Sequence, residues 1–94
     1  MTYFCYYVIR EVRQMRIGEA VKERILELCR ENGITVNKLA TISGLTQSTL
    51  NNIVSGRNQS TTVVTVQKIC NGLEISVRDF YKSPLFDTLE QEIQ

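Results

Sequence analysis

Single glycines divide this sequence into short segments. The five glycines lie where periodic patterns of apolar residues stop, which is where helix C-caps and turns use this residue: Gly18, Gly33, Gly44, Gly56 and Gly72. The spacing therefore predicts short helices joined by short turns.

The segment from Glu19 to Asn32 predicts the first of these helices. Its apolar residues follow the i, i+4, i+7, i+8 pattern of a helix with one buried side: Val21, Ile25, Leu28 and Cys29. Glutamates at every fourth position from Glu19 to Glu31 form an acidic row on another side. Gly33 is expected to end the helix.

The stretch from Thr35 to Gly56 predicts two more short helices around a tight turn. Thr35 is placed to cap a helix that ends at Gly44, and Thr46 is placed to cap a helix that runs to about Ser55. Helices joined by a short turn cross closely, so a small side chain such as that of Ala40 is needed at the crossing. The residues expected to form the core of this motif are Leu39, Ala40, Gly44, Leu45, Leu50 and Ile53.

The third helix carries amides and hydroxyls where a solvated helix usually carries lysine and glutamate. At about 100° per residue, Leu50 and Ile53 point to one side of it. The opposite arc is polar and contains Gln47, Ser48, Asn51, Asn52 and Ser55. One face is thus expected to pack and the other to bind a partner, unless the polar face is merely solvated.

Length and charge limit what the chain is able to do. With 94 residues, of which 43% are hydrophobic and 22% charged, one small globular domain is expected. The net charge of +1 does not by itself indicate a nucleic-acid binder. The distribution is more informative, because no acidic residue occurs between Glu31 and Glu74, while Lys38, Arg57 and Lys68 lie in that interval.

The cysteines and the absence of histidine argue against several kinds of site. Three widely spaced cysteines favour a reduced, cytoplasmic protein without a zinc site. The chain has no histidine, the commonest general base, and no phosphate-binding glycine loop. We therefore expect no enzyme activity, metal, cofactor or small-molecule ligand. The apolar run from Tyr3 to Ile9 is too short to span a membrane.

Together these residues resemble the Cro/repressor-type (XRE-like) helix-turn-helix DNA-binding family. The family pattern is present in Leu39-Ala40, Gly44, Leu45 and Thr46. The resemblance continues through SGR at 55–57 and TTVVTVQKICNGLEISVRDFY at 61–81, which are similar to the end of the family's third helix and to its fourth and fifth helices. It covers about residues 17–81 and implies an all-α fold, a five-helix Cro/repressor-like helix-turn-helix bundle.

The sequence departs from the family pattern at three positions. The loop after Gly56 has no proline before the fourth helix, where Thr62 is able to cap instead. Val64 occupies a position that is usually polar. Gly72 stands where alanine is common, so we expect the end of the fourth helix to fray. None of these changes lies in the third helix.

The resemblance implies a sequence-specific transcriptional regulator that enters the DNA major groove with the helix Gln47 to Ser55. By the family's pattern, the first, second and sixth residues of this helix face the bases, which here are Gln47, Ser48 and Asn52, and Asn51 lies in the same polar arc. Because Gln and Asn pair bidentately with adenine, we expect at least one A·T pair at a contacted position.

Phosphate contacts are expected from basic and polar groups around that helix, namely Thr35, Lys38, Thr49, Arg57 and Asn58. With so few cations, a monomer would bind DNA weakly. We therefore expect a homodimeric repressor on a pseudo-palindromic operator in double-stranded DNA, with its recognition helices about 34 Å apart.

The two ends of the chain, residues 1–16 and 83–94, lie outside the DNA-binding domain expected at 17–82. Aromatic and β-branched residues in the first segment favour a short β-strand that pairs with the same strand of a second chain through Tyr3, Tyr6 and Val8. The alternative is that Met15 is the natural start and the segment packs only opportunistically.

After Pro84, apolar residues recur at near-helical spacing and predict a short amphipathic helix: Leu85, Phe86, Leu89 and Ile93. Phe86 and Leu89 are expected to contact either a second chain or the core of their own chain.

A second function class stays open at this point. The chain could be a protein-interaction module, such as an antitoxin or adaptor, that uses the same fold with little or no specific DNA binding. The acid-free region around Gln47, Asn52 and Arg57 has no evident purpose in such a module, so the regulator is favoured.

Overall fold

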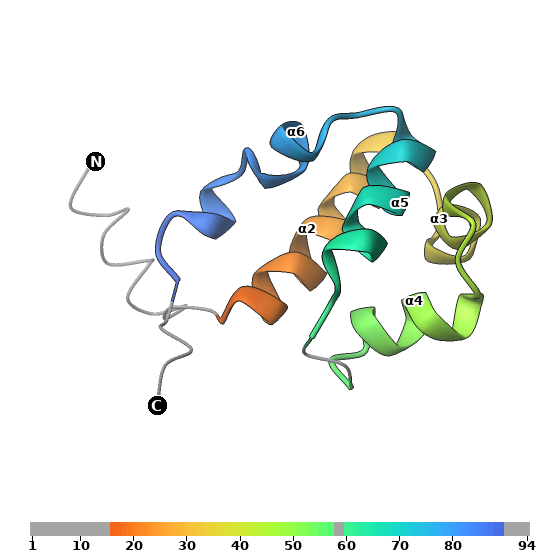
Figure 1. The fold of residues 1–94 in the computed structure, drawn as a ribbon, viewed down its shortest axis with the longest axis horizontal. Helices are drawn as coiled ribbons and strands as arrows, with labels where there is room; N and C mark the ends of the chain where they lie inside the picture. The colour runs from red at the N-terminus through yellow and green to blue at the C-terminus, as the bar shows by residue number, and fades with distance from the viewer. Residues whose placement is uncertain (1–15, 58–59, 90–94) are drawn as a thin grey trace.

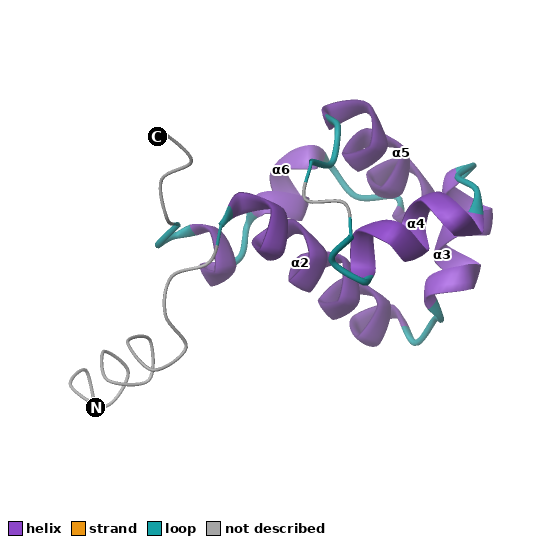
Figure 2. Cartoon of the chain, turned by 90° about the horizontal axis from the view of Figure 1, so that it is seen from below, coloured by secondary structure: helices purple, strands orange, loops and turns teal. Residues whose placement is uncertain are grey.

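The computed structural model describes residues 16–57 and 60–89, which form a small helical bundle (Figure 1). The α-helices are α2 (Ile17–Asn32), α3 (Val36–Ser43), α4 (Gln47–Val54), α5 (Val63–Leu73) and α6 (Val77–Tyr81), and a 3-10 turn, η1 (Pro84–Phe86), follows. The helical segments of the described chain are shown in purple in Figure 2. The predicted all-α, five-helix bundle is confirmed, whereas the proposed N-terminal strand with Tyr3, Tyr6 and Val8 lies outside the described residues.

The helices pack in an order that places α3 and α4 together at one end of the molecule (Figure 1). α2 contacts α3, α4 and η1, while α3 contacts both α4 and α5. α5 also contacts α6, and the chain after α6 runs back along α2. α4 is therefore supported from behind by α2 and α3, which leaves its other side facing outward.

Three helices end in the same backbone motif. After α3, Gly44 has a φ of 72° and its N–H donates to Thr41 O at 3.3 Å, while Leu45 N–H donates to Ala40 O at 2.9 Å. This is the Schellman arrangement, and it recurs at Gly33 after α2 and at Glu74 after α5. Glu74 has a φ of 59°, so a non-glycine residue takes the left-handed conformation there.

Hydroxyl side chains begin four of the five described α-helices. Each accepts the N–H of the residue three positions later, which is the N-cap bond expected of Ser and Thr. The capping residues are Thr35, Thr46, Thr62 and Ser76. Thr62 thus starts α5 without the proline that the family often has there.

The glycine pattern predicted that all five glycines end helices or lie in turns, but two of them lie inside helices. Gly18 is in the first turn of α2, and Gly72 is in the last turn of α5. A Cβ at Gly72 would lie 2.7 Å from Ser43 Oγ and 2.9 Å from Ile42 O. In the structure α5 continues through Gly72 to Leu73, and Gly72 allows the backbone of α3 to approach. The expected fraying of this helix end stays a prediction.

The core is formed by the apolar faces of all five described α-helices. Its fully buried large side chains are Ile25, Leu39, Leu50, Ile69, Cys70 and Phe80. Ala40 is also completely buried, where α3 meets its neighbours. The residues that follow the Schellman glycines and Glu74, namely Ile34, Leu45 and Ile75, pack against this core.

A buried arginine joins the first described helix to the last. Arg24 is only 8% exposed, and its Nε donates to Phe80 O at 2.6 Å while its Nη2 donates to Asp79 O at 2.8 Å. Its Nη1 donates to Glu27 Oε1 at 2.7 Å, so a neighbouring carboxylate balances the charge. The guanidinium gives two carbonyl groups at the C-terminal end of α6 a side-chain donor. Asp79 O also accepts the backbone N–H of Lys82 at 3.2 Å.

The segment after α6 packs against its own chain. Pro84–Phe86 forms the 3-10 turn η1, and the Phe86 ring lies 4.9 Å from the Tyr81 ring and 6.3 Å from the Phe80 ring, centroid to centroid. Phe86 and Leu89 are both half-buried. From Leu85 to Leu89, the described part of the expected amphipathic helix is not an α-helix: the 3-10 turn ends at Phe86, and residues 87–89 are not helical. The remainder of the expected helix lies outside the described residues.

Candidate nucleic-acid interface

The exposed face of α4 is made of amides and hydroxyls. Gln47, Ser48, Thr49 and Asn51 are exposed and Asn52 is half-buried. On the opposite side, Leu50 is 0% and Ile53 is 2% exposed. Figure 2 shows α4 at the surface beside α3, so this polar face is free to approach a large ligand.

The connection between α3 and α4 fixes the angle at which α4 leaves the core. Gly44 ends α3 in the left-handed conformation, Leu45 is half-buried against the core, and Thr46 caps α4. A turn of this length with an apolar anchor in its middle is the connection of a helix-turn-helix.

The hydroxyl groups at the start of α4 leave a donor available to solvent. Thr46 Oγ1 accepts the Thr49 N–H at 3.0 Å and donates its own hydrogen to Thr49 Oγ1 at 2.7 Å. Thr49 therefore retains its hydroxyl hydrogen for an outside acceptor. At the start of α3, Thr35 Oγ1 similarly accepts the Lys38 N–H at 3.0 Å.

Backbone N–H groups add to these donors. The first two amides of each helix have no acceptor within the helix, which concerns Val36 and Asn37 in α3 and Gln47 and Ser48 in α4. Helix N-termini favour anions because the helix dipole places positive charge there. Lys38 is exposed on the first turn of α3, so one side chain adds a full positive charge nearby.

Arg57 contacts a residue of α4. Gly56 has a φ of 85° and turns the chain after the helix, and Arg57 Nη1 then donates to Asn52 Oδ1 at 3.3 Å. Arg57 is exposed. Sequence reasoning assigned both residues to DNA contact, but it did not predict a bond between them. Asn58, the remaining expected phosphate ligand, lies outside the described residues.

The described residues offer little for metal or redox chemistry. Over 16–57 and 60–89, no three His, Cys, Asp or Glu side chains are grouped to hold a metal ion. Cys29 and Cys70 are buried in the core, and burial raises the pKa of both thiols. A raised pKa lowers the fraction of reactive thiolate. In the same part of the chain, no helix combines the length and apolar character that crossing a bilayer requires.

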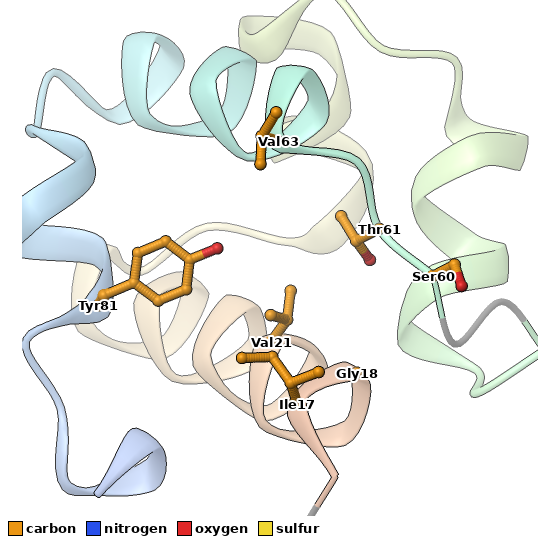
Figure 3. Close-up of a pocket in the computed structure, with 7 residues that line it drawn as sticks. All are labelled: Ile17, Gly18, Val21, Ser60, Thr61, Val63 and Tyr81. Atoms are coloured by element: carbon orange, nitrogen blue, oxygen red, sulfur yellow. The ribbon is translucent and has the colours of Figure 1, made fainter. Parts of the chain in front are cut away.

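An apolar surface on α5 and α6 was missed from the sequence. Val63 is 80%, Val64 56% and Val77 45% exposed. We call these valines, together with Tyr81 of α6 and the adjoining Ile17 of α2, the α5–α6 surface. Two adjoining hollows of about 410 Å³ and 220 Å³ share Val63 and Tyr81. Figure 3 shows the larger one between the start of α2, the segment before α5, and Tyr81. The departure at Val64, where valine stands in a usually polar position, was the signal in the sequence that could have revealed this surface.

Comparison with known proteins gives a consistent result. Residues 24–84 match the family described as the Cro/C1-type HTH DNA-binding domain. The crystal structure of the prophage Lp1 protein 11 is similar, with 38% sequence identity and a TM-score of 0.70 over 81% of this chain and 100% of that one. No curated protein matches the chain. The fold, the helix-turn-helix and the family match agree that this chain belongs to the Cro/C1-type helix-turn-helix family and is a DNA-binding regulator.

Proposed function

We propose that this protein is a dimeric repressor that recognises a pseudo-palindromic operator by inserting α4 into the major groove. The observation that carries the proposal is the exposed amide and hydroxyl face of α4, supported on its other side by Leu50 and Ile53. The major groove admits one α-helix and presents a distinct set of donors and acceptors for each base pair. Occupying a promoter in this way would block transcription.

The base contacts are assigned to Gln47, Ser48, Asn51 and Asn52. Gln47 and Ser48 are in the first turn of α4, which is the part of a recognition helix that enters the groove deepest. An exposed Gln is able to pair bidentately with adenine, at about 1 to 3 kcal/mol of discrimination against a wrong base.

The phosphate contacts are assigned to Lys38, Arg57, the hydroxyls of Thr35 and Thr49, and Asn58. The backbone N–H groups at the starts of α3 and α4 lie next in the chain to Thr35, Lys38 and Thr49. Two exposed cations in this region correspond to the release of about two counterions per protomer. Such a protomer binds weakly, and two linked protomers are needed for a specific complex.

The second copy of the chain is expected to cover the α5–α6 surface. Val63, Val64 and Val77 are too exposed to contribute to the protomer's own core, and a contiguous apolar surface of this kind is typical of a protein contact. An isologous interface on it would bury the same valines from both chains and fix the spacing of the two α4 helices. We assign the predicted contacts through Tyr3, Tyr6, Val8, Phe86 and Leu89 to the same interface.

The first test is a fluorescence-anisotropy titration of the protein against the DNA upstream of its own gene and against a scrambled duplex, at two salt concentrations. The expected result is a preference of a hundredfold or more for the native duplex, with two chains per site. Weak and equal binding that disappears with modest salt would leave only phosphate attraction and would support the protein-interaction module instead.

Substitutions separate base recognition from phosphate attraction. Gln47→Ala should relax the preference at one base pair, whereas Lys38→Ala should weaken matched and scrambled DNA alike. Asn71→Ala removes an exposed amide from α5 and should change neither. Equal effects of Gln47→Ala on matched and scrambled DNA would exclude base recognition by Gln47.

The dimer is tested separately with Val63→Asp. Val63 is the first residue of α5, where a carboxylate is favourable to the helix, so the fold should be retained. Sedimentation equilibrium should then report monomers where the unsubstituted chain gives dimers. An unchanged dimer would place the interface elsewhere.

A further inference from the structure

The bond between Arg57 and Asn52 limits how the Asn52 side chain is presented to DNA. A carboxamide accepts hydrogen bonds through its oxygen and donates them through its nitrogen. Arg57 Nη1 donates to Asn52 Oδ1 at 3.3 Å. A flipped carboxamide would place the Nδ2 hydrogens against the hydrogens of the guanidinium, so Arg57 holds the amide in one orientation.

In this orientation, the free end of Asn52 is a donor. Among the hydrogen bonds of residues 16–57 and 60–89, none is donated by Asn52 Nδ2. Asn52 lies on the last turn of α4 and is half-buried, so few other positions are open to its side chain. The neighbouring guanidinium adds positive charge and further N–H donors.

The two purines differ in how they match such a surface. A bidentate contact with adenine needs the Asn52 oxygen to accept from N6 through the one lone pair that Arg57 leaves, beside a guanidinium whose own N–H donors find no acceptor on the adenine N6 amino group. Guanine presents two acceptors, N7 and O6, to the major groove, and these match the N–H donors of both side chains. We propose that Arg57 and Asn52 act as one unit that selects guanine over adenine at the base pair facing Asn52. This inference rests on the proposed function and replaces the adenine contact that the sequence suggested for Asn52; Gln47 keeps its adenine contact.

Arg57 is thus a positioning residue for Asn52 as well as a cation near the backbone. The guanidinium has five N–H donors, and the bond to Asn52 uses one of them. Loss of Arg57 should therefore have two effects that are measured separately. Affinity for all DNA should fall, and the preference for guanine at one position should be lost.

The experiment uses the full chain and duplex DNA selected by the unsubstituted protein from a randomised library. Comparison with Asn52→Ala identifies the base pair that faces Asn52, as the position where preference disappears. Affinities are then measured for duplexes with guanine or adenine at that position. Lys38→Ala is the matched control, because it removes one cation of the same interface without touching Asn52.

The expected result is a preference for guanine on the order of tenfold in the unsubstituted chain, and its loss in Arg57→Ala. Lys38→Ala should weaken binding and keep the preference. The inference is overturned if the unsubstituted chain prefers adenine at this position, or if Asn52→Ala affects no position. It is also overturned if Arg57→Ala keeps the guanine preference unchanged. If the unsubstituted chain enriches no sequence at all, the proposed function itself is refuted.

Discussion

Replacing Gly72 with alanine sets a gain in helix propensity against a steric conflict. Gly72 lies in the last turn of α5, and alanine at an unconstrained helical position is favoured over glycine by about 1 kcal/mol. At this position the added Cβ would lie 2.9 Å from Ile42 O and 2.7 Å from Ser43 Oγ. The first of these atoms belongs to the backbone of α3, so relief requires α3 and α5 to separate.

The steric cost should exceed the gain. Overpacking of a close contact costs about 1 to 3 kcal/mol, and the backbone cannot rotate away as a side chain does. Because the Ile42 atoms in this conflict are backbone, we take the upper part of that range, about 2 to 3 kcal/mol, and subtracting the propensity gain leaves a net loss of about 1 to 2 kcal/mol. For a domain of this size, that corresponds to a melting temperature lower by roughly 4 to 16 °C.

Thermal unfolding followed by circular dichroism measures this difference. Asn71→Ala is the control, since it improves helix propensity at an exposed neighbouring position and should leave the melting temperature unchanged or slightly raised. Adding Ser43→Ala to Gly72→Ala should recover only part of the loss, because the contact with Ile42 O remains. A melting temperature of Gly72→Ala equal to or above that of the unsubstituted protein would refute the argument.

Three further changes test other parts of the structure. Arg24→Leu removes the donors to two carbonyl groups of α6 and should lower the free energy of unfolding in urea by about 2 to 4 kcal/mol. An unchanged free energy of unfolding would contradict the stabilising role of Arg24 between α2 and α6. Thr46→Val removes the cap of α4 and should cost about 1 kcal/mol while lowering DNA affinity; unchanged stability would contradict the capping role. Burial raises the pKa of Cys29 and Cys70, so the unfolded chain, with ordinary thiol pKa values of 9.0, releases protons first, and stability should fall as the pH rises above that value. Urea midpoints that stay constant or rise in that range would contradict this linkage.

The sequence was informative wherever local chemistry determines the structure. The caps at Thr35, Thr46 and Thr62 and the left-handed turns at Gly33 and Gly44 depend on a few adjacent residues, so their types were enough to predict the helix boundaries to within a few residues. The amide face of α4 was visible for the same reason, because helical periodicity alone separates it from Leu50 and Ile53.

The features that were missed depend on segments distant in the sequence. Arg24 finds its partners 55 and 56 residues away, and no local pattern marks an arginine as buried. Gly72 looked like a weak helical position because its neighbour, the backbone of α3, was unknown. Glu74 occupies a left-handed position without being glycine, so residue type gave no signal there. The bond of Arg57 to Asn52 required the turn at Gly56 to be seen in three dimensions.

The arginine that joins α2 to α6 also determines when the domain is able to finish folding. During synthesis, α2 and the helix-turn-helix leave the ribosome well before residues 79 and 80, and until then two of the three hydrogen bonds of Arg24 have no acceptors. Closing contacts across so much chain carries a loop entropy that slows the final step. Nascent chains that end before α6 should therefore remain sensitive to protease, and DNA binding should begin only when the last helix has been made.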